Sequence, residues 1–407
     1  TIRKNRITAA STQIDVKTAK AALFPSLSFS TSQQVVNRPY QETSSRVSGS
    51  EIISSNSKTS YNGNYGLNAS WTLYNGNKRL KTIQQEKLNN QVAELDVATS
   101  ENNIQESIAQ VYIQILYAAE SVKVNESTLQ VSIAQRDRGQ ELLNAGSIAK
   151  SDFAQLEAQV STDRYQLVTA QATLEDYKLQ LKQLLELDGE NEMNIYLPAL
   201  SDENVLAPLP TKKDVYISAL SLRPEIEASK LNVEASELGI GIAKSSYLPT
   251  ISLSAGIGTN HTSGSDFTFG EQVKNGWNNS IGLSVSVPIF NNRQTKSAVQ
   301  KAKLQYETSM LSLLDEQKTL YKTIEGLWLD ANSAQQRYAA ANEKLKSTQI
   351  SYELISEQFN LGMKNTIELL TEKNNLLQAQ QEQLQAKYMA ILNTQLLKFY
   401  QGDQLAI

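Results

Sequence analysis

Two long proline-free stretches with a heptad pattern constrain this chain more than any other feature of its sequence. No proline lies between Pro39 and Pro198 or after Pro288. Each stretch can therefore run as one helix of about 65 to 70 residues, roughly 100 Å long at 1.5 Å per residue, and such a rod cannot fold into a compact domain. Mostly apolar residues recur in the first stretch at alternating steps of four and three, which is the pattern of a coiled-coil seam: Ile104, Ile108, Val111, Ile115, Ala118, Val122, Asn125 and Leu129.

The second stretch repeats the first, which indicates a duplicated half. Gly146 and Gly362 lie 216 residues apart, and so do Tyr74 and Phe290 within LYNGNKR and IFNNRQT. The segment ALFPSLSFS reappears as YLPTISLSA at a different offset, so the change in length falls between predicted strands. The second seam continues the same alternation: Met310, Leu313, Gln317, Leu320, Ile324, Leu327, Ala331, Ala334, Tyr338, Ala341, Leu345, Thr348, Tyr352, Ile355 and Phe359.

Each rod is predicted to end at a glycine and to be followed by a returning helix. Gly146 and Gly362 hold these positions, and glycine is the preferred residue just past a helix C-terminus. A helical hairpin is the favoured interpretation, and a free-standing coiled coil or a kinked single helix is the alternative. Apolar spacing resumes after the first glycine at Phe153, Leu156, Val160, Leu167, Leu174, Tyr177, Leu181 and Leu184.

Four segments with strict alternation predict β-strands. Residues 61–73 and 280–287 alternate between apolar side chains and small uncharged polar ones, and shorter versions occupy 26–30 and 250–257. Neither face carries charge, which favours a transmembrane barrel with lipid on one side and water on the other. A soluble sandwich is the alternative, although its solvent face would usually carry Lys and Glu. Because four strands cannot close a pore and lipid tolerates no open sheet edge, several chains must share one barrel.

Composition excludes several other classes of function. The chain has 38 basic and 42 acidic residues and a net charge of -4, without the basic patch that nucleic acid would need. There is no cysteine, and the methionines Met193, Met310, Met363 and Met389 form no ligand cluster, so we expect no metal and no cofactor. The lone His261, which we place in a Gly/Ser loop between two strands, has no nucleophile or metal partner at useful spacing. No enzyme activity is expected.

The ends and hydropathy of the chain add two expectations. No apolar run approaches the roughly 18 residues that a spanning helix requires. The sequence begins at Thr1 without a charged and then apolar leader, so we expect any signal peptide to have been removed or never to have been part of this sequence.

Each half reads as helix, strand, loop, strand, very long helix, glycine tip and returning helix. This order resembles the TolC-like outer-membrane efflux proteins over essentially the whole chain. The segments that carry the resemblance are ALFPSLSFS, SSYLPTISLSAGIG, WTLYNGNKR, VPIFNNRQT, LRPEIEASK and FNLGMKNTIELL.

The resemblance implies a mainly α fold with a small membrane β-part. Long coiled-coil helical hairpins would form an α-barrel, and four β-strands would be contributed to a trimeric 12-stranded β-barrel. The predicted parts are a first repeat at 1–187, a linker at 188–222 and a second repeat at 223–407, with the barrel strands inside 25–74 and 249–290.

The implied function is that of an outer-membrane exit duct in a tripartite efflux or secretion system of a Gram-negative-type envelope. The duct would be a passive homotrimer in outer-membrane lipid, opened at its periplasmic tip when a periplasmic adaptor and an inner-membrane pump dock. A periplasmic adaptor-like coiled-coil linker is the alternative function, and it would need only one hairpin. The transported substrate is set by the pump and is not encoded here.

The resemblance also assigns gate residues at the tips. Acidic residues six and nine positions past the second glycine line the tunnel in the family, and Glu368 and Thr371 hold these positions. A basic residue, here Lys364, is held in the family by an acidic one, here Asp152, and Phe359 stands where a tyrosine is common. We therefore hypothesise that Asp152 and Lys364 tie the hairpins shut.

Local alternatives remain for these residues. Ser151 and Asp152 could cap the returning helix, and Lys364 with Glu368 could be an ordinary i, i+4 pair. Small residues at both tips suit an end-on adaptor contact, although a simple turn explains them too: Asn144, Ala145, Gly146, Ser147, Ile148, Asn360, Leu361, Gly362 and Met363.

Overall fold

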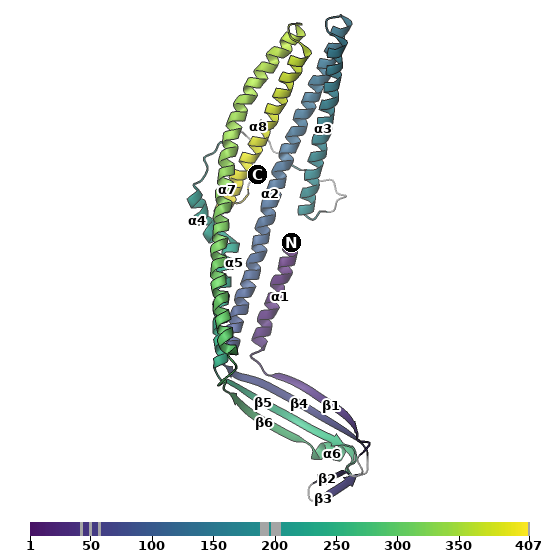
Figure 1. Cartoon of the computed structure of the whole chain (residues 1–407), viewed down its shortest axis with the longest axis vertical. Helices are drawn as coiled ribbons and strands as arrows, with labels where there is room; N and C mark the ends of the chain where they lie inside the picture. Colours follow the sequence, from purple (N-terminus) through teal and green to yellow (C-terminus); the bar gives the residue numbers. More distant parts are fainter. Residues whose placement is uncertain (41–43, 49–50, 56–57, 188–194, 197–204, 406–407) are drawn as a thin grey trace. The chain divides into compact units, whose positions relative to one another are not determined.

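The computed structural model describes residues 1–40, 44–48, 51–55, 58–187, 195–196 and 205–405 (Figure 1). The chain divides into two compact units. One unit comprises residues 1–2, 96–227 and 314–407 and is called the hairpin unit below. The other comprises residues 3–95 and 228–313 and is called the sheet unit.

The order of elements predicted for each half is confirmed. The first half contains α1 (Ile2–Ala21), β1 (Ser26–Asn37), β2 (Ser44–Ser48), β3 (Glu51–Ser55), β4 (Thr59–Asn75), α2 (Lys78–Asn144) and α3 (Lys150–Leu184). Between the halves lies α4 (Lys212–Leu222), and the second half contains α5 (Pro224–Lys244), the 3-10 turn η2 (Ser245–Tyr247), β5 (Thr250–Thr262), α6 (Phe269–Asn275), β6 (Asn278–Ser286), α7 (Gln294–Asn360) and α8 (Thr366–Gln401). Both long helices have 67 residues, as the repeat requires.

The sheet unit holds an open antiparallel sheet in the order β1-β4-β5-β6. Its register places one row of apolar residues across all four strands, from Leu27 through Ala69 and Ala255 to Ile281. The row on the opposite face consists of Ser28, Asn68, Gly256 and Ser280. The predicted alternation is therefore confirmed, and the two faces differ in chemistry.

The turns from strand into long helix show that the duplication extends to backbone conformation. Gly76 and Asn77 have φ angles of 66° and 62°, and the residues 216 positions later, Asn292 and Arg293, have 51° and 65°. Two successive left-handed residues are unusual outside such turns. In the first half the turn is held in place by the Ser245 hydroxyl, which donates to the Gly76 carbonyl oxygen at 2.8 Å.

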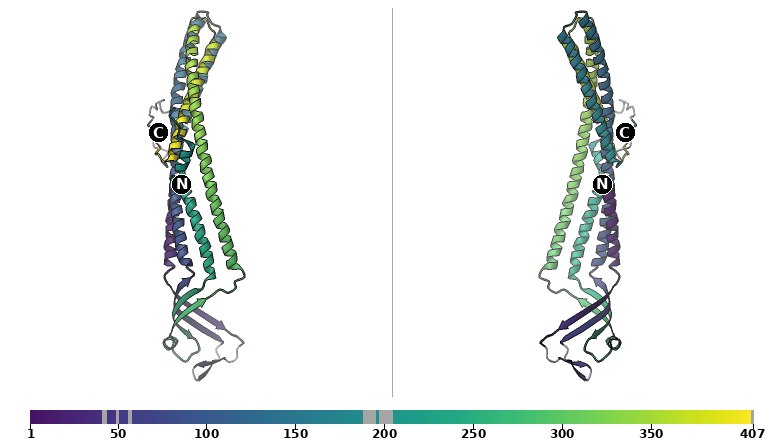
Figure 2. Two further views of the ribbon diagram at one scale, coloured as in Figure 1. Left: turned by 90° about the vertical axis from the view of Figure 1, so that its left-hand side faces the viewer. Right: turned by 90° about the vertical axis from the view of Figure 1, so that its right-hand side faces the viewer.

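The hairpin unit is built from α3, α4, α8 and the C-terminal parts of α2 and α7. Each long helix turns back at its end into a shorter helix, as Figures 1 and 2 show. The predicted seams are largely buried: Ile115, Ala118 and Leu129 on α2, and Ile324, Ala331, Ala334 and Tyr338 on α7. The four α7 residues belong to two apolar cores that draw on α2, α4, α5, α7 and α8.

Three features differ from the predictions or add to them. His261 lies within β5, opposite Gly63, and not in a loop as predicted, because pairing with β4 extends β5 beyond its alternating apolar residues. The β2–β3 hairpin and the helix α6 stand in segments that were predicted only as loops. Residues 188–194 and 197–204 of the predicted linker lie outside the described residues, and its last part forms α4.

Candidate functional site

Both hairpin tips have the same helix-ending geometry. Gly146 and Gly362 adopt left-handed φ angles of 75° and 73°. The amide of Gly146 donates to the Leu143 carbonyl oxygen at 2.9 Å, and the amide of Ser147 donates to that of Leu142 at 2.8 Å. The same pair of bonds recurs at the second tip, so both helices end in a Schellman motif. The predicted hairpin tips are confirmed.

The two tips differ in the side chains that they expose. Leu361 and Met363 at the second tip are 69% and 70% exposed, whereas Ile148 at the first is half-buried. The other predicted tip residues are small or polar and also lie largely at the surface. The second tip therefore presents an apolar surface that is available for contact.

The start of α8 holds Glu368 in a local network. Its carboxylate accepts from the Lys364 ammonium at 2.6 Å and from the Asn365 amide at 3.2 Å, while the Asn365 side chain accepts from the Glu368 amide at 2.9 Å. This reciprocal arrangement is a capping box. The hydrogen bond from Lys364, followed by that from Asn365, lowers the pKa of Glu368 below its ordinary 4.5.

The remaining predicted gate residues also have local partners. Asp152 accepts from the Ala149 amide at 3.4 Å, and the Thr371 hydroxyl donates to the Ile367 carbonyl oxygen at 2.8 Å. Phe359 is buried. In the described part of one chain, no ion pair joins Asp152 to Lys364, so the latch stays a prediction.

A buried charged cluster joins three helices of the hairpin unit, and the sequence analysis missed it. Asp163 on α3 is 1% exposed and Lys373 on α8 is 3% exposed, and the two form an ion pair. The buried Ser132 hydroxyl on α2 donates to Asp163 and accepts from Lys373, and Gln159 donates to the second Asp163 oxygen at 2.8 Å. Burial lowers the pKa of Lys373, and Asp163 opposes this effect. Charged residues at heptad positions could have signalled the cluster.

A second missed network surrounds Arg223, in the LRPEIEASK segment. The Arg223 side chain is 6% exposed and pairs with Glu106 at 2.9 Å and with Glu225 at 2.8 Å. Its guanidinium also stacks over the Tyr400 ring, 4.0 Å from the centroid. Arg223 thus ties the junction between α4 and α5 to α2 and α8.

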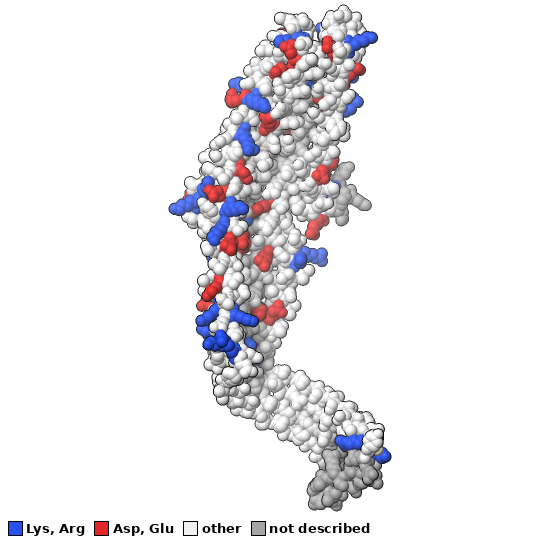
Figure 3. Space-filling view, viewed as in Figure 1, with Lys and Arg blue, Asp and Glu red and all other residues white. Residues whose placement is uncertain are grey.

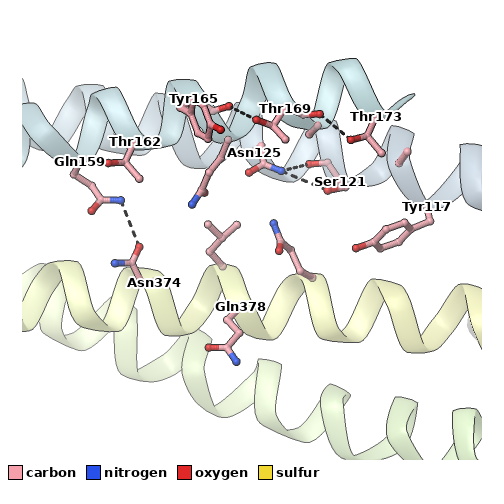
Figure 4. Close-up of a pocket in the computed structure, with 15 residues that line it drawn as sticks. Tyr117, Ser121, Asn125, Gln159, Thr162, Tyr165, Thr169, Thr173, Asn374 and Gln378 are labelled. Carbon is pink, nitrogen blue, oxygen red and sulfur yellow. Dashed lines mark hydrogen bonds between the residues drawn. The ribbon is translucent and has the colours of Figure 1, made fainter. Parts of the chain in front are cut away.

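A groove of about 590 Å³ lies between α2, α3 and α8, farther from the tips than the charged cluster. Figure 4 shows Tyr165, Thr169 and Thr173 of α3 on one side and Asn374 and Gln378 of α8 on the other. The fifteen residues that line the groove include no charged side chain. The groove offers hydrogen-bonding groups but no charged side chain that would select cations or anions.

The sheet is as free of charge as this groove. None of β1, β4, β5 and β6 contains Asp, Glu, Lys or Arg. Apolar side chains such as Phe29, Ile281 and Leu283 are 65% or more exposed in the single chain. In Figure 3 the helices carry blue and red side chains, whereas the sheet is almost entirely white. The apolar face of the sheet is therefore uncovered in the single chain.

The sequence profile of the outer membrane efflux protein family matches residues 1–186 and 215–402. The chain belongs to this family. The resemblance to TolC-like proteins is thereby confirmed, and membership places the protein in the outer membrane of a Gram-negative envelope.

Relatives within the outer membrane efflux family are distant in sequence. Outer membrane efflux protein BepC of Brucella suis is 24% identical over 294 residues, which cover 72% of this chain and 61% of BepC. Outer membrane protein TolC of Escherichia coli is 23% identical over 311 residues, which cover 74% of this chain and 62% of TolC. The match thus spans about three fifths of the length of these curated relatives.

Solved structures of membrane channels share the fold of this chain. CusC has a TM-score of 0.82 at 19% identity, covering 99% of this chain and 89% of that chain. The CmeC outer membrane channel of Campylobacter jejuni has a TM-score of 0.79 at 18% identity, covering 100% of this chain and 84% of that chain.

In the part of the chain that the structure describes, no three His, Cys, Asp or Glu side chains gather closely enough to hold a metal ion. Among the described helices, none has a segment with the length and hydropathy needed to cross a bilayer. His261 packs against aromatic rings, with Tyr65 stacked at 5.8 Å and Phe269 edge-on at 5.0 Å between centroids.

Proposed function

We propose that this protein is the outer-membrane exit duct of a tripartite efflux or secretion system, acting as a passive trimeric channel. One observation carries the proposal: in a chain of the outer membrane efflux family, the sheet is open, uncharged, and apolar on one face only.

The open sheet requires other strands at both of its edges. β1 and β6 stand at the ends of the strand order, so within the described residues each has a row of backbone N–H and C=O groups without a strand partner. In hydrocarbon each unsatisfied backbone group costs several kcal/mol, so a spanning sheet must close on itself. Closure by three copies gives a barrel of 12 strands, with the apolar face toward lipid and the Ser, Asn and Gly face toward water.

The helical hairpins support a tunnel that continues the barrel toward the periplasm. Two hairpins from each of three copies would enclose a channel of coiled helices. An adaptor needs only one hairpin and no lipid-facing sheet, and the relatives and structures above are outer-membrane efflux proteins and channels. The duct is therefore favoured over the adaptor, and we infer no catalytic activity for a member of a family of channels.

We further propose that the tips form the gate and the docking surface. The exposed Leu361 and Met363 suit an end-on contact with a periplasmic adaptor that is itself coupled to an inner-membrane pump. Three copies of Glu368 would form an anionic ring that favours cations. For the latch, Lys364 must exchange Glu368 for Asp152 in the closed assembly, because it pairs with Glu368 in the single chain.

The two faces of β6 provide the decisive experiment. Leu283 belongs to the apolar face and its neighbour Ser284 to the polar face. We expect Leu283→Lys to abolish membrane insertion, because a lysine toward lipid costs about 2–4 kcal/mol at the bilayer midplane. Ser284→Lys should insert as a trimer and lower the cation preference of the pore.

Insertion is measured by heat-modifiable trimer bands in purified outer membranes, and the pore by conductance in planar bilayers. The wild-type protein should conduct without any partner present, at least in brief openings. A protein that never conducts, or two lysine variants that insert equally well, would refute the proposed duct. The adaptor alternative predicts that both lysine variants are soluble proteins.

A further inference from the structure

The buried cluster formed by Ser132, Asp163 and Lys373 joins the two hairpins by charge. Asp163 belongs to the first hairpin and Lys373 to the second, and their side chains are almost fully buried. Ser132 contacts both of them from α2. Neutral contacts also join the hairpins, at Gln135 with Tyr352 and at Gln159 with Asn374 (Figure 4). Neutral groups can exchange such bonds with water at little cost, whereas a buried charge cannot.

The cluster is not part of the repeated unit. The offset of 216 residues maps Asp163 onto Ala379 and Lys373 onto Glu157. Ala379 is fully buried and Glu157 is exposed, so the equivalent place has no buried ion pair. The duplication explains the seams and the turns, but it does not explain these charges. They serve the contact between the first and the second hairpin.

The apolar residues around Lys373 cannot by themselves fix how the hairpins align. A slide of α8 by one turn, about 5.4 Å, would bring Leu369 or Leu377 into the place of Lys373. Both leucines are buried, so apolar packing would survive the slide. The charges would not, because Asp163 would face a leucine and Lys373 would be buried without its partner. A single polar residue in a coiled-coil seam sets register in this way.

The neighbouring groove removes a second means of alignment. On the side away from the tips, about 590 Å³ of open space lies between α3 and α8 (Figure 4). Its lining consists of amides, hydroxyls, small side chains, Leu377 and the rings of Tyr117 and Tyr165, and the contact across it between Gln159 and Asn374 is a neutral hydrogen bond. The cluster joins α3 directly to α8 by an ion pair, whereas the Arg223 network ties α2 to α8.

We propose that Ser132, Asp163 and Lys373 form a register lock that fixes one axial alignment of the two hairpins within a chain. The lock sets the axial position of Glu368, which lies five residues before Lys373, relative to that of Asp152 on the first hairpin. The alignment holds whether or not the protein conducts, whereas its importance for the gate rests on the proposed function. The three side chains are thus positioning residues for the tip.

The test compares distances in variants with and without the lock. The chain contains no cysteine, so spin labels attach only to the introduced Arg164→Cys on α3 and Asn375→Cys on α8. Both parent residues are exposed. Labelled chains are diluted with unlabelled ones, so that distances within one chain dominate the pulsed electron paramagnetic resonance signal.

We expect one narrow distance in the wild type. Lys373→Met should lower Tm by about 6 °C or more, because one buried charge loses its partner. The double variant Asp163→Leu/Lys373→Met should keep a Tm close to that of the wild type, since apolar pairs often replace buried ion pairs without loss. It should nevertheless show a broadened or split distance distribution, with alignments about one helical turn apart.

A matched control removes the exposed pair between Lys344 of α7 and Glu382 of α8, which lie 2.8 Å apart and are 44% and 42% exposed. Lys344→Met/Glu382→Leu should leave the narrow distance unchanged. A single narrow distance in Asp163→Leu/Lys373→Met would overturn the lock. Wild-type protein with that narrow distance but without bilayer conductance would refute the duct and leave the lock standing.

Discussion

The Arg223 network allows the sharpest prediction about stability. Arg223 is buried between two carboxylates, Glu106 and Glu225, and contacts the ring of Tyr400. Arg223→Met keeps much of the side-chain volume but removes the charge. We expect the variant to fold and to lose stability in the hairpin unit, because both carboxylates then lie in a poorly solvated site without a cation.

The size of the loss follows from burial. Removing one partner of a buried ion pair costs about 3–5 kcal/mol. The two carboxylates are 18% and 21% exposed and can regain some water, so the lower end of the range applies. The lost cation–π contact with Tyr400 adds about 1 kcal/mol. At roughly 2–4 °C for each kcal/mol in a unit of this size, Tm should fall by about 8–16 °C.

Unfolding is followed by circular dichroism at 222 nm and by Trp fluorescence in detergent. The matched control is Arg138→Met on α2, where an arginine that is 47% exposed pairs with Glu141. A surface pair of this kind contributes about 0–1 kcal/mol, so Tm should change by no more than a few degrees. If Arg223→Met melts within 2 °C of Arg138→Met, the reasoning is wrong.

Two predictions concern the gate. The lowered pKa of Glu368 means that its ionised form is stabilised, and this contribution is present above about pH 4.5 and lost as pH falls through the folded-state value. Cation preference, measured as a reversal potential, should therefore stay constant down to pH 4.5 and fall only below it, whereas a decline beginning near pH 6 would contradict the assignment. Asp152→Ala should raise the open probability of single channels through loss of the latch, and Glu175→Ala, an exposed acidic residue on the same helix, should not; equal open probabilities would exclude the latch.

The relation between the two halves explains where sequence reasoning succeeded. Heptad spacing, strict alternation and a glycine after a helix are local patterns. They correspond to a helix, a strand and a left-handed helix end, respectively. The long helices, the tips at Gly146 and Gly362 and the four strands were therefore predictable. The uncharged strands and the quoted motifs also predicted the family.

Other features depended on partners far apart in the sequence. Asp163 and Lys373 are separated by 210 residues, and Arg223 lies 117 residues from Glu106. A charged residue in a helix is normally solvated, and only the packing of three helices shows that these charges are buried and paired. The assignment of His261 to a loop failed for a related reason, because the length of β5 is set by pairing with β4.

The sequence by itself determined which segments are helices, strands and tips, since these follow from short-range periodicity and from the conformational freedom of glycine. It also determined that the strands avoid charge. Only the tertiary structure decided which charges leave water and which of them meet. Heptad spacing can mark a charged residue in a seam, but its partner lies on a distant segment that no local pattern identifies.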